Sequence, residues 1–388
     1  MDPQFGRWWA RVASELVLLL GLIVMTNSEA SGAAPGLGLR VTSSGVLTKN
    51  GAPYRGIGVN YYDAFIRTLR NPQDDSYQDG FAKLGANKIP FARFAAGGHR
   101  ASDVQLYLTE KASYFQRLDG VVAAAEKAHV GLIANLFWSI SAVSDAVHEP
   151  RERWGDANSE TRKLMRKYTQ EVVSRYVNSP AIWGWEFSNE LSLAVDMKPG
   201  AVAPGHALSY DTFRRAALDF AQVVREIDAN RILLTGNSLP RAYAYHSSTA
   251  GVVRTDTEEQ FAHILLRDNP DPFSPLCIHA SQANVGHYFA DRPVSFQQLL
   301  EACMKIGQRV KKPVYLEEFI PLPKGADTMP QRSEHEYFSG ELAAIQKSNV
   351  PLASVWEYDR KLTRDRFSLT FDNERSYMLE MIAAANRH

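Results

Sequence analysis

The sequence has 388 residues, 45% of them hydrophobic, and its 43 basic and 43 acidic side chains give a formal net charge of zero. This length allows one large domain or two ordinary ones. The balanced charge and the lack of a basic run argue against nucleic acid or an anionic membrane surface as a partner.

The N-terminal segment has the layout of a secretory signal peptide. Two arginines precede an apolar stretch at 16–25, and small residues follow at plausible cleavage positions after Ala30 or Ala33. The apolar stretch is short for a transmembrane helix, and Glu15 at its edge departs from the signal-peptide pattern, so the alternative is an uncleaved anchor. We therefore expect residues 1–33 to be a signal peptide. The mature protein is expected to be secreted, to the extracellular space or the periplasm, with no membrane association once the signal is cleaved.

Strand and helix patterns alternate along the rest of the chain. The pair Asn50-Gly51 predicts a hairpin turn near the start. Buried strands are predicted at 56–60, 88–94, 131–138, 182–188, 232–235, 276–280, 314–318 and 353–356. Helices are predicted at 76–84, 113–127, 160–176, 210–227, 257–267, 294–309, 332–347 and 373–385. Eight strands, each followed by a helix, predict an α/β fold, a single (β/α)8 TIM barrel over residues 34–388.

The polar and aromatic residues of interest concentrate at the C-terminal ends of the predicted strands, where barrels of this kind carry their active sites. The fourth strand ends in Asn189-Glu190 and the seventh in Glu317-Glu318. Burying an unpaired charge is costly, so such residues belong at an open strand end that faces a cleft. Two strands that each deliver a carboxylate to one rim indicate the paired acids of a glycoside hydrolase.

These strand ends resemble those of the cellulase-type glycoside hydrolases of family 5, which belong to a clan of retaining β-glycosidases on (β/α)8 barrels. The residues that carry the resemblance are Gly58-Val59-Asn60, Arg93, Asn189-Glu190, the run 312–319 and Trp356. The resemblance covers nearly all of the chain after the N-terminal segment.

The resemblance implies Glu190 as general acid/base and Glu318 as nucleophile. Arg93 would lie beside Glu318 and keep it ionised, because a nearby cation favours the charged form. Asn189 would hydrogen-bond the sugar 2-hydroxyl, and Trp356 would form the floor under the scissile sugar. The other substrate-binding candidates are Asn60, Trp138, His287 and Tyr288.

The sequence departs from the family pattern at three places. Leu191 replaces the usual proline after Asn-Glu. The usual His-x-Tyr motif after strand six appears as His287-Tyr288-Phe289. The histidine often found at the end of strand three is absent. On strand seven, Glu317 is the rival nucleophile. Neighbouring residues on a strand point to opposite faces, so only one of Glu317 and Glu318 can face the barrel mouth. The match to the family favours Glu318. Glu186 is a similar decoy for Glu190, because it lies earlier in its strand and is expected to be buried in a hydrogen-bonded network.

We therefore predict a retaining hydrolase of β-linked oligo- or polysaccharides, of the endo-β-1,4-glucanase or β-mannanase type, that needs no cofactor or metal. One alternative is an exo-β-glycosidase or transglycosylase on the same barrel, and long inserts at 140–157 and 236–275 favour a partly closed site. A catalytically silent carbohydrate-binding barrel is another. A metal-dependent hydrolase would use His279, His287, Glu317 and Glu318, which lack the usual ligand spacing. Cys277 and Cys303 are either a disulfide or two buried thiols.

Overall fold

The computed structural model describes residues 36–197, 208–282, 288–290, 292–321, 331–361 and 367–387. The predicted signal peptide at 1–33 lies outside these ranges. None of the helices within them is long and apolar enough to span a membrane.

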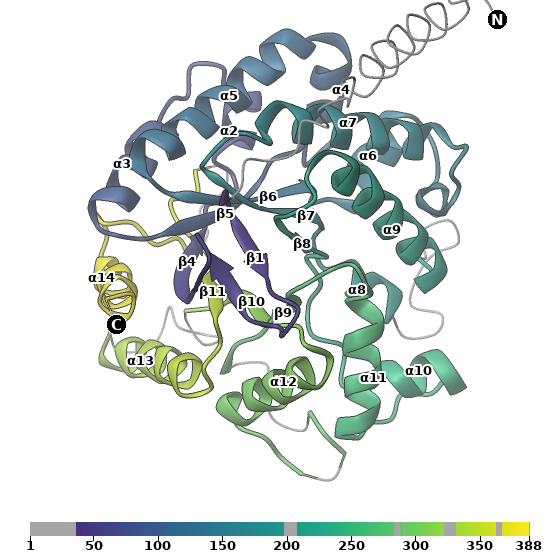
Figure 1. Cartoon of the computed structure of the whole chain (residues 1–388), viewed down its shortest axis with the longest axis vertical. Helices are drawn as coiled ribbons and strands as arrows, with labels where there is room; N and C mark the ends of the chain where they lie inside the picture. The colour runs from purple at the N-terminus through teal and green to yellow at the C-terminus, as the bar shows by residue number, and fades with distance from the viewer. Residues whose placement is uncertain are drawn as a thin grey trace, which may run out of the picture. The chain divides into compact units, whose positions relative to one another are not determined.

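Eight parallel strands in the described residues form one barrel sheet, ringed by helices (Figure 1). The order of the strands around the sheet is β8-β7-β6-β5-β4-β11-β10-β9. Their bounds are β4 (Gly56–Asn60), β5 (Phe91–Ala95), β6 (Gly131–Phe137), β7 (Ile182–Ser188), β8 (Ile232–Leu234), β9 (Leu276–His279), β10 (Val314–Phe319) and β11 (Leu352–Val355). The predicted strands and the (β/α)8 class are thus confirmed.

The predicted helices are present as α3 (Tyr77–Ala86), α5 (Lys111–Ala128), α7 (Glu160–Tyr176), α9 (Tyr210–Ile227), α11 (Glu258–Asp268), α12 (Phe296–Val310), α13 (Gln331–Lys347) and α14 (Ser376–Ala385). Side-chain caps fix where several of them begin. Ser159, Ser209, Thr257 and Ser295 each accept a hydrogen bond from the backbone N–H three residues later. Shorter elements that were not predicted are α2 (Ile66–Arg70), α4 (Ala101–Thr109), α6 (Ile140–Ala146), the 3-10 helix η1 (Arg151–Gly155), α8 (Leu191–Val195) and α10 (Ala244–Ala250).

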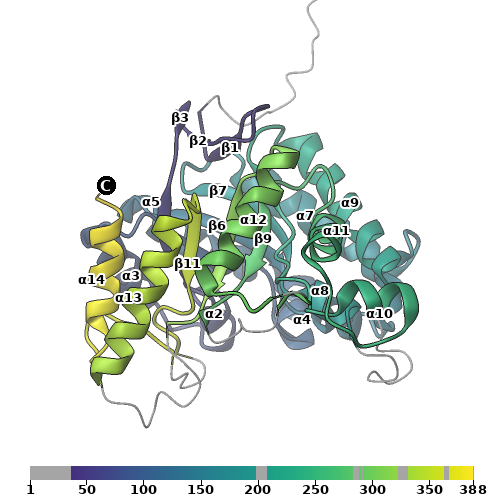
Figure 2. The same cartoon turned by 90° about the horizontal axis from the view of Figure 1, so that it is seen from below.

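A small antiparallel sheet lies at the N-terminal end of the barrel, opposite α8 and α10 (Figure 2). It consists of β1 (Leu39–Val41), β2 (Leu47–Lys49) and β3 (Ala52–Pro53). Asn50 and Gly51 form the predicted turn, with φ angles of 53° and 80°. Leu39 and Leu47 pack onto an apolar cluster of residues from the barrel strands. This closure leaves the C-terminal end of the barrel as the open one.

The barrel closes between β8 and β9 through a side chain rather than a ladder. In the described residues no ladder pairs these two strands. Instead, the Oδ1 atom of Asn269 accepts hydrogen bonds from the hydroxyl of Thr235 and the backbone N–H of Cys277, both at 2.9 Å. Asn269 is fully buried, and its amide joins β8 to β9 at the seam, beside an isolated backbone bridge in which the N–H of Ser274 donates to the carbonyl of Leu233 at 2.9 Å.

Both cysteines are buried thiols. Cys277 lies on β9 and Cys303 on α12, and neither forms a disulfide within the described structure. This settles the alternative that the sequence left open.

Candidate active site

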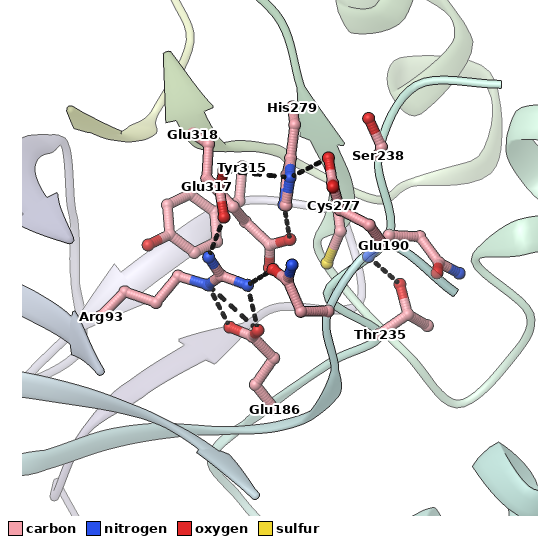
Figure 3. A network of polar contacts seen from close by, with 12 residues as sticks. Arg93, Glu186, Glu190, Thr235, Ser238, Cys277, His279, Tyr315, Glu317 and Glu318 are labelled. Carbon is pink, nitrogen blue, oxygen red and sulfur yellow. Dashed lines mark hydrogen bonds and ion pairs between the residues drawn. The ribbon is translucent and has the colours of Figure 1, made fainter. Parts of the chain in front are cut away.

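Arg93 on β5 is the centre of the polar network at the open end of the barrel (Figure 3). Its side chain is fully buried, and each of its three nitrogens donates hydrogen bonds. The Nε atom donates to both carboxylate oxygens of Glu186, at 3.0 and 2.9 Å. The Nη2 atom donates to Glu186 at 2.6 Å and to Oδ1 of Asn189 at 2.7 Å. The Nη1 atom donates to Oδ1 of Asn60 at 3.1 Å and to Oε1 of Glu318 at 2.6 Å.

Strand register explains why these residues meet. Asn60 of β4 is the register partner of Arg93, and Asn135 of β6 is the partner of Glu186 on β7. All four residues are completely buried. Asn135 donates to the Glu186 carboxylate and, at 2.6 Å, to the backbone carbonyl of Ser188. The guanidinium therefore lies in a layer of side chains that cannot move independently. Glu186 belongs to this buried support, and not to the cavity above it.

His279, the last residue of β9, lies between three carboxylates. Its Nδ1 atom is 3.0 Å from Oε1 of Glu190 and 3.6 Å from Oε2 of Glu318. Its Nε2 atom is 3.2 Å from Oε2 of Glu317. One ligand-type atom from each of Glu190, His279 and Glu318 lies within 4.8 Å of the others. The histidine therefore links the two candidate catalytic carboxylates to a third, fully buried one.

A tight backbone turn presents the Glu190 side chain. Glu190 has a left-handed conformation (φ 53°), and its N–H donates to the carbonyl of Gly236 at 2.7 Å. Gly236 has φ 73°, and a Cβ atom at this position would lie 1.6 Å from the carbonyl oxygen of Ser188. Only glycine permits this close approach. The loop after β8 thus holds the Glu190 backbone through Gly236, and the Ser238 side chain of the same loop hydrogen-bonds the Glu190 carboxylate.

The neighbouring acids on β10 differ in exposure. Glu317 is fully buried, whereas 15% of the Glu318 side chain is exposed. Burial and the charge of Glu186 raise the pKa of Glu317 to about 7. Glu318 faces the cavity, at the position that the resemblance gives to the nucleophile.

The pKa values of the two cavity carboxylates shift in opposite directions. Burial alone would raise the pKa of Glu190, but the hydrogen bond and positive charge of His279 lower it. For Glu318 burial is the dominant influence and its pKa is raised, although His279 and Arg93 oppose the shift. Burial also disfavours the charged form of His279, yet Glu318, Glu190 and Glu317 raise its pKa to about 10. The three carboxylates therefore favour the protonated, positively charged form of His279.

A cavity of about 440 Å³ opens above Glu190, His279 and Glu318. The other residues that line it come mainly from the loops after β8 and β9, and they include Leu193, Ser238, Leu239, Arg241, Tyr243, Ser281, Tyr288 and Ile320. Tyr288, a predicted substrate-binding residue, lines this cavity while its hydroxyl donates to the carbonyl of Pro240. Its neighbour His287 lies outside the described residues. The structure instead places His279 at the end of the sixth barrel strand.

Aromatic side chains pack against the Arg93 guanidinium. The Trp138 ring lies over the Arg93 guanidinium, with 4.3 Å between the ring centroid and Cζ. Trp356 is only partly buried, and its ring centroid is 6.0 Å from that of Trp138. Tyr62 packs against both tryptophans, at 4.8 and 5.9 Å. This wall, which we call the aromatic wall (Tyr62, Trp138 and Trp356), borders the Arg93 network on the side that the resemblance assigns to the scissile sugar.

The sequence analysis named Arg93, Asn60, Asn189, Glu190 and Glu318, and the structure brings all of them into one network. It missed the role of His279, which it considered only as a metal ligand in a rival hypothesis. The available signal was its position near the end of a predicted buried strand, 276–280. A lone histidine there is equally compatible with an ordinary buried residue.

The fold and the site together define a class: a (β/α)8 barrel that brings two carboxylates close together at the C-terminal ends of its strands, as retaining glycoside hydrolases do. Residues 47–264 match the sequence model described as cellulase (glycosyl hydrolase family 5). Because this match covers more than half of the sequence, the chain belongs to glycosyl hydrolase family 5.

Similar proteins carry mannan-related names. Mannan endo-1,4-beta-mannosidase A of Podospora anserina is 29% identical over 197 residues, covering 44% of this chain and 50% of that protein. Mannan endo-1,4-beta-mannosidase F of Aspergillus fumigatus is 30% identical over 199 residues, covering 46% and 42%. The chain thus spans about half the length of the curated relatives it matches. The solved endo-1,4-beta-mannanase of Rhizomucor miehei shares the fold, with a TM-score of 0.63 and 16% identity over 90% of this chain and 99% of that one.

Proposed function

We propose that this chain is a retaining β-glycoside hydrolase that cleaves β-1,4-linked mannan by double displacement. The observation that carries the proposal is the short distance between the cavity carboxylates, which have oxygens within 4.8 Å of each other. Retaining enzymes hold their two carboxyl groups about 5–5.5 Å apart, whereas inverting enzymes need roughly 6.5–9.5 Å to admit a water molecule. The geometry supports direct attack on the sugar by one carboxylate.

In this proposal Glu318 is the nucleophile and Glu190 is the general acid/base. Arg93 donates to Glu318 at 2.6 Å and so stabilises its charged form and fixes its orientation. Glu318 attacks the anomeric carbon while Glu190 protonates the leaving oxygen. Glu190 then deprotonates the water that hydrolyses the glycosyl-enzyme ester. Asn189, whose Oδ1 is held by Arg93, has its amide N–H₂ left to meet the sugar 2-hydroxyl.

The opposite pKa shifts define when this pair is active. Catalysis requires protonated Glu190 together with ionised Glu318. Because the pKa of Glu190 is lowered and that of Glu318 is raised, only part of the enzyme carries this combination. That part is largest at a pH between the two pKa values.

The names of the relatives support mannan as the substrate, and the cellulase name of the family supports a β-glucan as the second candidate. We place the catalytic unit in residues 34–388 and propose export through the signal peptide at 1–33. The endo-1,4 names of the relatives favour endo-action. The cavity, lined by the loops after β8 and β9, keeps an exo-glycosidase or a transglycosylase as the alternative.

A substrate panel tests the proposal. β-1,4-mannan, β-1,4-glucan, β-1,3-glucan and aryl β-glycosides are incubated with the purified chain, and released reducing ends are measured. Mannan is expected to give the highest kcat/KM, with oligosaccharide products of mixed length. Hydrolysis of glucan in preference to mannan would instead support β-glucan as the substrate. Saturable binding of a glycan without any turnover would favour the silent carbohydrate-binding barrel.

A further inference from the structure

Three potential metal ligands converge on the cavity. They are the Nδ1 atom of His279, Oε1 of Glu190 at 3.0 Å from it, and Oε2 of Glu318 at 3.6 Å from it. Ligands bound to one tetrahedral zinc ion at about 2.0–2.2 Å lie roughly 3.3–3.6 Å apart. The two distances measured from Nδ1 are therefore close to those of a zinc site. The Glu190 and Glu318 oxygens lie within 4.8 Å of each other, and rotation of the Glu190 carboxylate would bring them closer.

The contact made by Nε2 of His279 also supports a metal site. Fully buried Glu317 lies 3.2 Å from Nε2 of His279 and can accept its N–H. The Nδ1 atom faces the two cavity carboxylates, so its lone pair becomes available to an ion at that position once the Nδ1 proton has left. Histidines that bind metals commonly donate their second N–H to a carboxylate in this way, which fixes the ring and strengthens the ligand. Glu317 thus supplies the supporting interaction that a cluster of acids alone would lack.

We propose that Glu190, His279 and Glu318 form a binding site for a divalent transition-metal ion of the Zn²⁺ type. The ion would displace the proton from Nδ1, and water from the adjoining cavity would complete its coordination. Imidazole with two carboxylates suits Zn²⁺, whereas Mg²⁺ and Ca²⁺ prefer six or more oxygen ligands. The site is therefore selective for the transition metal.

The consequence of binding is inhibition, because the ion occupies both carboxylates that the proposed mechanism requires. Zn²⁺ and substrate then compete for the same cavity. This second part rests on the proposed function, whereas binding of the ion does not. The two are separated by measuring binding directly, without substrate.

Isothermal titration of the untagged full chain with ZnCl₂ at pH 8 tests the site. One ion per chain is expected to bind, with no heat from MgCl₂ under the same conditions. His279→Asn should abolish this binding, and Glu317→Gln should weaken it by about 10- to 100-fold through loss of the supporting carboxylate. The matched control is His129→Asn, since His129 is exposed and has a left-handed backbone (φ 55°) that asparagine tolerates.

Thermal unfolding is recorded for each variant, so that loss of binding is interpreted only for folded protein. Unchanged Zn²⁺ affinity in His279→Asn, or equal losses in His279→Asn and His129→Asn, would overturn the proposal. If binding behaves as expected, kinetics follow: added Zn²⁺ should raise the apparent KM without changing kcat. A fall in kcat at constant KM would contradict the shared cavity while leaving the glycosidase assignment intact.

Discussion

Replacing Arg93 by lysine isolates the part of the Arg93 network that supports catalysis. Lysine keeps the positive charge but has one nitrogen in place of three. It therefore cannot donate hydrogen bonds to Glu186, Glu318, Asn60 and Asn189 at the same time. The strong pairing with buried Glu186 is the contact that a single ammonium would retain. We therefore expect the 2.6 Å hydrogen bond to Glu318 to be lost.

A hydrogen bond to a charged group contributes about 1.5–3 kcal/mol. At about 1.36 kcal/mol per factor of ten in rate, this predicts a fall in kcat/KM of roughly 10- to 150-fold. The assay is hydrolysis of the best substrate from the panel at 25 °C, normalised to the folded fraction measured by circular dichroism. Most of the fall should appear in kcat, because the contact orients the attacking carboxylate.

Arg231→Lys is the matched control. Arg231 is equally buried and donates to three backbone carbonyls and to Asp228, but these contacts lie away from the network around Arg93. Both variants should lower the midpoint of urea unfolding, and only Arg93→Lys should lower kcat/KM of the folded enzyme. If Arg93→Lys retains kcat/KM within a factor of two, or if Arg231→Lys loses as much, the reasoning is refuted.

Three further outcomes follow from the structure. His279→Asn removes the cation that lowers the pKa values of both Glu190 and Glu318. Both limbs of the pH profile of kcat/KM should therefore move to higher pH, and an unmoved profile would exclude this role of His279. Trp356→Ala should lower kcat/KM about 5- to 30-fold, on an estimate of roughly 1–2 kcal/mol for a stacked ring, and Trp356→Phe should recover part of it; equal losses in both variants would argue against stacking. Asn269→Ala leaves a buried N–H without its partner at the barrel seam, so the free energy of unfolding should fall by about 1–3 kcal/mol in urea titration, with little change in kcat/KM; an unchanged unfolding midpoint would show that the seam does not depend on this side chain.

The barrel was predictable because its strands and outer helices carry long, regular patterns. The periodicity of α7 and α9 predicts their bounds, and apolar runs define β4 and β7. The short helices at the rim, such as α8 and α10, have too few turns to show a periodicity. They also depend on contacts with distant segments, as when Asn237 accepts a hydrogen bond from the N–H of Ser192 at the start of α8.

The site was predictable where one residue at a strand end carries the chemistry, as Glu190 and Glu318 do. It was not predictable where function arises from several partners that are far apart in the sequence. The pKa of His279 is raised by Glu318, Glu190 and Glu317, and the last two lie 89 and 38 residues away. Nothing in the neighbouring sequence distinguishes it from a buried histidine in the core. The burial of Glu186 in a hydrogen-bonded network was predicted from its place in the strand and is confirmed, but its pairing with Arg93 depends on the register of β5, β6 and β7.

The most direct test of the central claim follows the anomeric configuration of the products by ¹H NMR, for the parent enzyme and for Glu318→Ala with added azide. The parent should release the β-anomer first. Glu318→Ala should be inactive in buffer and should form an α-glycosyl azide, because azide enters from the face that the carboxylate has vacated. Release of the α-anomer by the parent, or parental activity of Glu318→Ala without azide, would contradict a double displacement at Glu318.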